Sequence, residues 1–179
     1  MVVTGLGTFT SLGHDAHEFF DRLVAGECGI KPISRFDATD YQTKIGSEVA
    51  DFEPSDYWDA KDAKRHDRYS HLAMAAAKTC LADAKLDVDA VEKKRFGVLI
   101  GSGVGGLESV EKACDILATK GPKRITPFLL PSIIGNTAGS MVAIELGAMG
   151  PNYGIVSACA TGTHAVSYTH LTLPTKWIV

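Results

Sequence analysis

The chain of 179 residues has a formal net charge of −3 and a hydrophobic share of 45%, which is enough to build the core of one ordinary domain. The slightly acidic balance gives no electrostatic reason to expect nucleic acid or an anionic membrane as the main partner. No apolar run approaches the length of a membrane span and the N-terminus lacks the pattern of a secretory signal, so we expect an intracellular protein without a membrane segment.

The first half of the chain predicts one short strand, two helices and a long loop. Val2–Thr4 is an apolar strand candidate that ends at a glycine turn. A helix follows Asp15, whose spacing to Glu18 forms a capping-box pattern. Residues 29–58 predict mostly loop with a possible strand over 45–50, and residues 66–84 predict a long helix. We expect the first helix to meet a sheet through Ala16, Phe19, Phe20, Leu23 and Val24, and the second to present Tyr69, Leu72, Ala73, Ala76 and Cys80.

The second half alternates strands and helices, which favours an α/β fold. Residues 96–100 predict a buried strand that runs into the glycine-rich segment 101–106, and then a helix over 107–120 that Gly121-Pro122 stops. Residues 132–146 predict a helix rich in small residues, which would let another backbone approach closely. A strand over 153–156 leads into a turn and a helix over 157–165.

The glycine-rich segment invites a nucleotide-binding interpretation, because Gly101, Gly103 and Gly106 fit the G-x-G-x-x-G spacing. That fingerprint belongs early in a βαβ unit, with an acidic residue about 20 positions further on. The corresponding region here is basic and reads Lys120-Gly121-Pro122-Lys123-Arg124. We therefore interpret the glycines as a tight backbone turn near a pocket.

The four cysteines, Cys28, Cys80, Cys114 and Cys159, form neither a CxxC pair nor a dense framework, so we expect neither disulfides nor a metal site. Cys159 follows an apolar strand and enters a helix, where unpaired backbone N–H groups and the helix dipole favour a thiolate. The same N–H groups could stabilise an oxyanion. The alternative, a buried packing cysteine, is our interpretation of Cys28, Cys80 and Cys114. Local context alone leaves both interpretations open for Cys159.

Several motifs match one family in order and spacing. They are Val2-Val3-Thr4-Gly5-Leu6-Gly7, Gly101-Ser102-Gly103-Val104-Gly105-Gly106-Leu107, Lys123-Arg124-Ile125-Thr126-Pro127-Phe128, Gly150-Pro151-Asn152-Tyr153 and Ser157-Ala158-Cys159-Ala160-Thr161-Gly162. Through them, residues 1–166 resemble the N-terminal portion of elongating β-ketoacyl-[acyl carrier protein] synthases, the type II fatty-acid condensing enzymes of bacteria and plastids. The resemblance implies the first half of a thiolase-like layered sandwich, which is usually a homodimer when complete.

The implied reaction passes an acyl group from acyl carrier protein to Cys159. Malonyl-acyl carrier protein then loses carbon dioxide, and its carbanion attacks the thioester to give a 3-oxoacyl chain. The resemblance implies no metal or organic cofactor, and a location in the bacterial cytoplasm or the plastid stroma.

Other site residues follow from the resemblance alone. The acyl-pocket candidates are Val104, Phe128, Leu129, Ile133 and Ile134, for which ordinary core packing is the alternative. The candidates for docking the acidic carrier protein are Lys61, Lys64, Arg65, Arg68, Lys123 and Arg124, for which a solvated helix face is the alternative.

The chain also departs from the family. The family's two catalytic histidines, its active-site lysine and its phenylalanine loop lie in motifs C-terminal to this stretch, so we expect the chain alone to be inactive. His164 is no substitute, because its separation from Cys159 does not place both on one helix face. Residues 167–179 favour an extended segment. We interpret them as foreign or out-of-frame residues, and a genuine short C-terminus is the alternative.

Two other functions stay open beside the condensing enzyme. A non-catalytic relative could bind carrier protein or set chain length, and the presence of Cys159 argues against it. A thiolase-like acyltransferase could act on acyl-CoA, and the basic cluster and the full motif order argue against it.

Overall fold

The computed structural model describes residues 2–170 of the chain, with side chains described up to residue 169. The helices are α1 Ala16–Val24, α2 Ala60–Ala63, α3 Arg68–Asp83, α4 Leu107–Lys120, α5 Leu129–Ile133, α6 Thr137–Leu146 and α7 Thr161–His170. The strands are β1 Ile30–Pro32, β2 Ile45–Ser47, β3 Val98–Gly101 and β4 Asn152–Ile155. Short 3-10 turns are η1 Pro54–Asp56, η2 Val88–Ala90, η3 Lys93–Arg95, η4 Pro122–Arg124 and η5 Ala158–Ala160. No helix within residues 2–170 is both long and apolar enough to cross a membrane.

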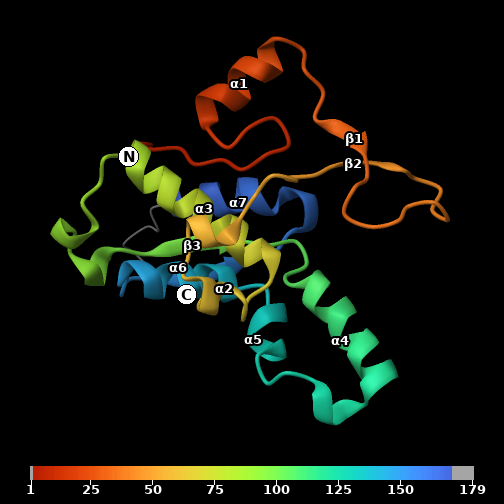
Figure 1. The fold of residues 1–179 in the computed structure, drawn as a ribbon. Coiled ribbons are helices and arrows are strands. Elements are labelled where there is room, and N and C mark those ends of the chain that lie inside the picture. Colours follow the sequence, from red (N-terminus) through yellow and green to blue (C-terminus); the bar gives the residue numbers. More distant parts are fainter. Residues whose placement is uncertain (1, 171–179) are drawn as a thin grey trace, which may run out of the picture.

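The centre of the molecule is a parallel pair of strands with helices packed on it. β3 pairs with β4 in a register that runs from Val98 opposite Asn152 to Gly101 opposite Ile155. Helices α6 and α7 both pack on these strands, and α3 packs on α6. In Figure 1 this assembly occupies the middle, with α1, β1 and β2 at one end and α4 and α5 at the other. The buried core is formed by Trp58, Ala63, Met74, Val98, Val142 and Ala143.

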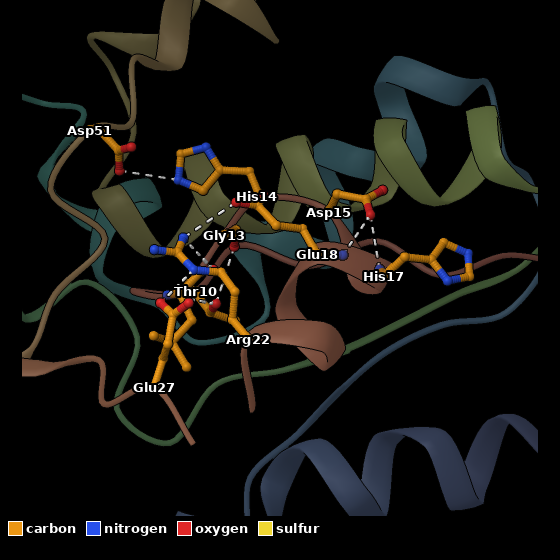
Figure 2. A network of polar contacts seen from close by, with 10 residues as sticks. Thr10, Gly13, His14, Asp15, His17, Glu18, Arg22, Glu27 and Asp51 are labelled. Atoms are coloured by element: carbon orange, nitrogen blue, oxygen red, sulfur yellow. Dashed lines mark hydrogen bonds and ion pairs between the residues drawn. The ribbon is translucent and has the colours of Figure 1, made fainter. Parts of the chain in front are cut away.

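Helix α1 begins at the predicted cap. Figure 2 shows the Asp15 carboxylate accepting hydrogen bonds from the N–H groups of His17, at 2.9 Å, and Glu18, at 3.0 Å. Near the other end of the helix, Arg22 Nε pairs with Glu27 at 2.8 Å, which fixes the chain where it leaves α1. The helix and its N-cap are therefore confirmed.

The apolar face of α1 does not meet a sheet. Phe20 is 63% exposed and Val24 is 72% exposed, and no residue of the helix is buried. The neighbouring strands β1 and β2 pair with each other as a three-residue antiparallel ladder, which is too small to cover the helix. The prediction of a sheet against this face is wrong for the described part of the chain.

Residues 2–4 do not form the predicted strand. The N-terminal segment lies along α3 instead, so closely that a Cβ added at Gly7 would lie 2.1 Å from the carbonyl oxygen of Ala76. The N–H of Leu6 donates to the carboxylate of Asp83 at 2.8 Å. Contacts with a helix therefore replace the strand ladder that the apolar pattern predicts.

These contacts also change which face of α3 is buried. The structure confirms the helix, but its buried residues are Ser70, Met74 and Ala75, and the predicted stripe is only half-buried. Because the N-terminal segment covers one side and α6 the other, the most buried positions lie between the two contacts.

The predicted helix over 132–146 is in fact two helices, α5 and α6, separated by residues 134–136. The carbonyl of Ile133 accepts the N–H of Gly106 at 3.1 Å, and the carbonyl of Ile134 accepts the hydroxyl of Tyr69. Ile134 itself has extended backbone, with ψ 134°. Partners from elsewhere in the chain therefore take carbonyls that a continuous helix would use, and the helix breaks.

Helix α7 runs through His170, so residues 167–170 are helical and not extended as predicted. The hydroxyl of Thr169 donates back to the carbonyl of Ala165 at 2.8 Å, which is a helical separation. Once α7 has begun at Thr161, each added residue gains a backbone bond, and this outweighs the weak β preference of the sequence. The predicted origin of residues 171–179 lies outside the described residues.

Candidate active site at the Cys159 turn

Cys159 lies between β4 and α7, in the strand–turn–helix arrangement that the sequence predicts. The residue is the middle one of the 3-10 turn η5, and this turn ends directly before the first residue of α7. Its side chain is exposed. Ala158, the residue before it, has φ 50°, a left-handed conformation that is uncommon for a residue with a side chain. The turn therefore presents the thiol to solvent through a backbone conformation that its surroundings must stabilise.

The parallel pairing of β3 and β4 explains why the glycine loop lies beside this turn. Gly101 is opposite Ile155 in the last pair of the register, so both chains leave the sheet at the same edge. A Cβ added at Gly103 would lie 3.6 Å from the carbonyl oxygen of Ala158. The carboxyl edge of parallel strands is where α/β proteins place ligands, and here it brings together the two motifs that the sequence singled out.

Protein backbone fills the space beside the later glycines of the loop. A Cβ at Gly105 would lie 2.4 Å from the carbonyl oxygen of Ile133, and one at Gly106 would lie 2.1 Å from that of Ser132. Gly105 also has φ 84°, which favours glycine. These contacts account for the glycines by close packing against α5, in agreement with the interpretation as a tight backbone turn.

Four hydrogen bonds hold the Cys159 turn, and one of them runs from the N–H of Thr161 to the carbonyl of Ala158. The N–H of Ser157 donates to Thr161 Oγ1 at 2.8 Å, and the N–H of Ala160 donates to the carbonyl of Ser157 at 3.1 Å. The ring Nδ1 of His164 lies 2.7 Å from Ser157 Oγ. His164 thus reaches back to Ser157 in the turn, a contact that the spacing between His164 and Cys159 does not predict. The separation of seven residues, two helical turns, was the available signal.

This arrangement suits nucleophilic chemistry. The turn lies at the start of α7, where the positive end of the helix dipole favours a thiolate or an oxyanion that forms on a bound carbonyl. The N–H groups of Ala160 and Thr161 are already bonded, to the carbonyls of Ser157 and Ala158. Within residues 2–170, no group of three or more side chains could hold a metal ion.

The other cysteines have different surroundings. Cys80 is half-buried and its thiol donates to the carbonyl of Gly5 at 3.3 Å, and burial raises the pKa of this thiol. Cys28 and Cys114 are exposed, so the prediction that they are buried packing residues is wrong. Cys28 lies in the loop before β1 and Cys114 on the outer side of α4, where nothing in the described chain covers them. All four thiols are free.

The acyl-pocket candidates fall into separate places. Ile133 adjoins the glycine loop, because its carbonyl accepts the N–H of Gly106, whereas the carbonyl of Ile134 accepts the hydroxyl of Tyr69 in α3. Val104, at the tip of that loop, is 72% exposed. Phe128 and Leu129 instead line a groove of about 240 Å³ whose described lining includes no residue of the Cys159 turn. The five residues therefore do not form one pocket in the described chain, and their role in acyl binding stays a prediction.

The same groove contains part of the basic cluster. Lys64, Arg65 and Lys112 contribute positive charge to it, and Ile116, Ile125, Phe128 and Leu129 are among its apolar lining residues. The guanidinium of Arg65 lies 4.9 Å from the centre of the Phe128 ring. Lys61, Lys123 and Arg124 are exposed, and Arg124 directly precedes the lining residue Ile125. The groove is thus apolar inside and carries cations at its border, of which Arg65 pairs with Asp62 at 3.0 Å and Lys112 pairs with Glu108 at 2.6 Å.

Arg68 differs from the lysines of the basic cluster. Its guanidinium donates to the carbonyl of Val49 and lies 5.4 Å from the centre of the Phe52 ring. Burial lowers the pKa of this half-buried guanidinium. Arg68 therefore ties the loop before η1 to α3, and its side chain is already engaged within the protein.

Asp67 is a second residue that the sequence analysis missed. It is 6% exposed, and its carboxylate accepts the N–H of Tyr69 at 3.3 Å and the N–H of Ser109 at 2.7 Å. One carboxylate thus joins the starts of α3 and α4. The predicted helix began at residue 66 and so included Asp67, whereas the structure has Asp67 as its N-cap. An aspartate near a helix start was a visible capping signal, but the second bond comes from a distant segment.

Comparison with known proteins places this geometry in a family. A 3-oxoacyl-[acyl-carrier-protein] synthase 2 from Synechocystis sp. is 45% identical over 166 residues, which are 93% of this chain and 40% of the relative. The chain thus spans about two fifths of the length of that relative.

Solved structures share the fold. A structure of the ishigamide ketosynthase/chain length factor matches with a TM-score of 0.85 at 28% identity, over 93% of this chain and 42% of that chain. A type II PKS acyl-carrier protein in complex with its ketosynthase matches with a TM-score of 0.76 at 20% identity, over 93% and 44%. The α/β fold is therefore the thiolase-like fold of the ketosynthases, in its N-terminal half. Because the family of the β-ketoacyl synthase N-terminal domain matches residues 1–173, the chain belongs to that family.

Proposed function

We propose that Cys159 is the acyl-accepting nucleophile of a 3-oxoacyl-[acyl carrier protein] synthase. The observation that carries the proposal is the exposed thiol in a strained turn, at the carboxyl edge of β3 and β4 and at the start of α7. The name of the Synechocystis relative supports the reaction class.

In the first half-reaction, the Cys159 thiolate attacks the carbonyl carbon of an acyl thioester on the carrier protein. The carrier thiol leaves and takes up a proton, and the acyl group remains on Sγ. The positive end of the α7 dipole would stabilise the oxyanion that forms between these two events.

In the second half-reaction, malonyl-acyl carrier protein loses carbon dioxide and its carbanion attacks the acyl group on Cys159. The thiolate then leaves, and the product is a 3-oxoacyl chain on the carrier protein. The groups that promote decarboxylation belong, by resemblance, to motifs beyond residue 166. Residues 1–166 would therefore supply the nucleophile and part of its surroundings, and we expect no turnover from the 179-residue chain alone.

Kinetics of the complete enzyme test the proposal. We expect Cys159→Ser to abolish 3-oxoacyl formation, because a serine hydroxyl in this turn is far less ionised than a thiol. Cys114→Ser, at an exposed cysteine of α4, should keep wild-type turnover. Substantial condensation by the Cys159→Ser enzyme would contradict the proposal.

We also propose that the basic groove receives the carrier protein, and that the complete enzyme is a homodimer. Lys64, Arg65, Lys123 and Arg124 border or adjoin an apolar recess, which suits a partner with acidic side chains around an apolar contact. Light scattering of the complete enzyme would show the dimer or contradict it.

Charge reversal tests the docking surface. Lys64→Glu with Arg65→Glu should lower kcat/KM for acyl carrier protein substrates much more than for a small acyl thioester, and the difference should shrink as salt is added. Lys94→Glu, at an exposed lysine outside the groove, serves as the matched control. Equal losses of kcat/KM with both substrates would indicate that these residues form a solvated face and do not dock the carrier protein.

The likeness to a ketosynthase/chain length factor structure keeps one second candidate in view. A subunit that only sets chain length would not need a nucleophile. In that case Cys159→Ser would leave product formation by an accompanying ketosynthase unchanged, which separates the two functions.

A further inference from the structure

His164 makes a contact that the proposed half-reactions do not use. Its ring Nδ1 lies 2.7 Å from Ser157 Oγ, and Ser157 stands two residues before Cys159. The N–H of Ser157 is held as well, by Thr161 Oγ1 at 2.8 Å. The start of the turn is therefore tied to α7 twice, once through the backbone and once through its side chain.

The backbone of the turn requires such support. Ser157 has φ −150° and ψ 43°, outside the regular regions, and Ala158 has φ 50°. Residues with side chains keep such conformations only when the surrounding contacts fix them. Thr161 is 5% exposed, and a Cβ at Gly101 would lie 2.3 Å from its methyl carbon, so this anchor is pressed against the end of β3.

We propose that His164 and Ser157 form a brace that holds the Cys159 thiol at the start of α7. Both are positioning residues, since they act on the nucleophile through the backbone of the turn. The contact forms with either protonation state of the imidazole, because a neutral Nδ1 accepts the Ser157 hydroxyl and a protonated Nδ1 donates to its oxygen. The inference rests on the proposed function in one respect, that Cys159 is the nucleophile whose position matters.

The rate of Cys159 alkylation by iodoacetamide in the complete enzyme tests the brace. Peptide mass spectrometry gives this rate beside those of Cys28 and Cys114, which are exposed and serve as references in the same molecule. We expect His164→Ala to lower the alkylation rate of Cys159 alone, by about fivefold, which is the factor that corresponds to the net free energy of one hydrogen bond. A relaxed turn withdraws the thiol from the positive end of the α7 dipole, which favours its attack.

Three further variants separate the brace from a general structural effect. His164→Asn should restore the rate, because its amide places a polar atom near the position of Nδ1. Ser157→Ala should match His164→Ala, and the double variant should lose no more than either single one. Thr163→Ala, at an exposed neighbour on α7, should leave the rate unchanged.

An unchanged Cys159 rate in both His164→Ala and Ser157→Ala would overturn the brace. So would additive losses in the double variant, or equal changes at all three thiols, since these indicate independent roles or a general loosening. If His164→Ala does not fold, Ser157→Ala and His164→Asn carry the same comparison. Failure of the proposed function would look different: wild-type Cys159 would be alkylated normally and yet accept no acyl group.

Discussion

Replacing Asp67 by alanine removes a carboxylate that caps α3 and also accepts an N–H from the first turn of α4. The lost N-cap costs about 1 kcal/mol. The N–H of Ser109, bonded at 2.7 Å in a part-buried site, loses its partner at a further cost of about 1–3 kcal/mol. We therefore expect Asp67→Ala to lower the free energy of unfolding by about 2–4 kcal/mol, a large share of the stability of an ordinary domain.

Urea unfolding followed by far-UV circular dichroism measures this change. Asp67→Asn keeps one acceptor oxygen, so its free energy of unfolding should fall by about half as much as that of Asp67→Ala. Asp15→Ala is the matched control, because Asp15 also accepts two N–H groups at a helix start, but its exposed donors can turn to water. Equal shifts of the urea midpoint for Asp67→Ala and Asp15→Ala would refute the reasoning that burial makes Asp67 special.

Three other predictions concern the same fold. Gly101→Ala should destabilise the chain and slow Cys159 alkylation, because the added Cβ would lie 2.3 Å from the methyl group of Thr161 at the start of α7. Gly162→Ala should stabilise α7, because nothing lies within 4 Å of the added Cβ and alanine favours a helix. A higher urea midpoint for Gly101→Ala than for Gly162→Ala would contradict this. Met74→Ala, at 1% exposure, should cost about 2–5 kcal/mol in the same assay, and a loss below that range would mean that the core collapses around the cavity. The hydrogen bond from Lys112 holds the pKa of Glu108 below its usual value, so the contribution of Glu108 to the free energy of unfolding is present above the unfolded pKa and is lost as the pH falls. Glu108→Gln should therefore flatten the plot of unfolding free energy against pH between about pH 5 and pH 3. Parallel plots for the wild type and the variant would contradict this assignment.

Elements with local signals were predictable from the sequence. Helix α4 begins and ends where the pattern placed it, because Gly121 takes φ 78° and Pro122 cannot continue the helix. The break between α5 and α6 was not predictable, since the groups that take the carbonyls of Ile133 and Ile134 belong to the glycine loop and to α3. Residues 2–4 carry a strand pattern, but the pattern does not say whether a partner strand exists.

The candidate site shows the same division. The position of Cys159 after a strand and before a helix followed from local pattern, whereas the strain at Ala158 and the contact between Ser157 and His164 depend on how the turn packs. The family resemblance placed Arg68 with the docking lysines, but its guanidinium contacts the carbonyl of Val49 and the ring of Phe52. Sequence gives the charge of a side chain, and only packing decides whether that charge is available to a partner.

Peptide mass spectrometry of the complete enzyme after incubation with acyl-acyl carrier protein, without the malonyl substrate, tests the central claim most directly. We predict one acyl group per active chain, on the peptide that contains Cys159, and none on the peptides of Cys28, Cys80 or Cys114. An acyl group on another cysteine, or an acyl-enzyme that persists in Cys159→Ser through a different side chain, would contradict the assignment of the nucleophile.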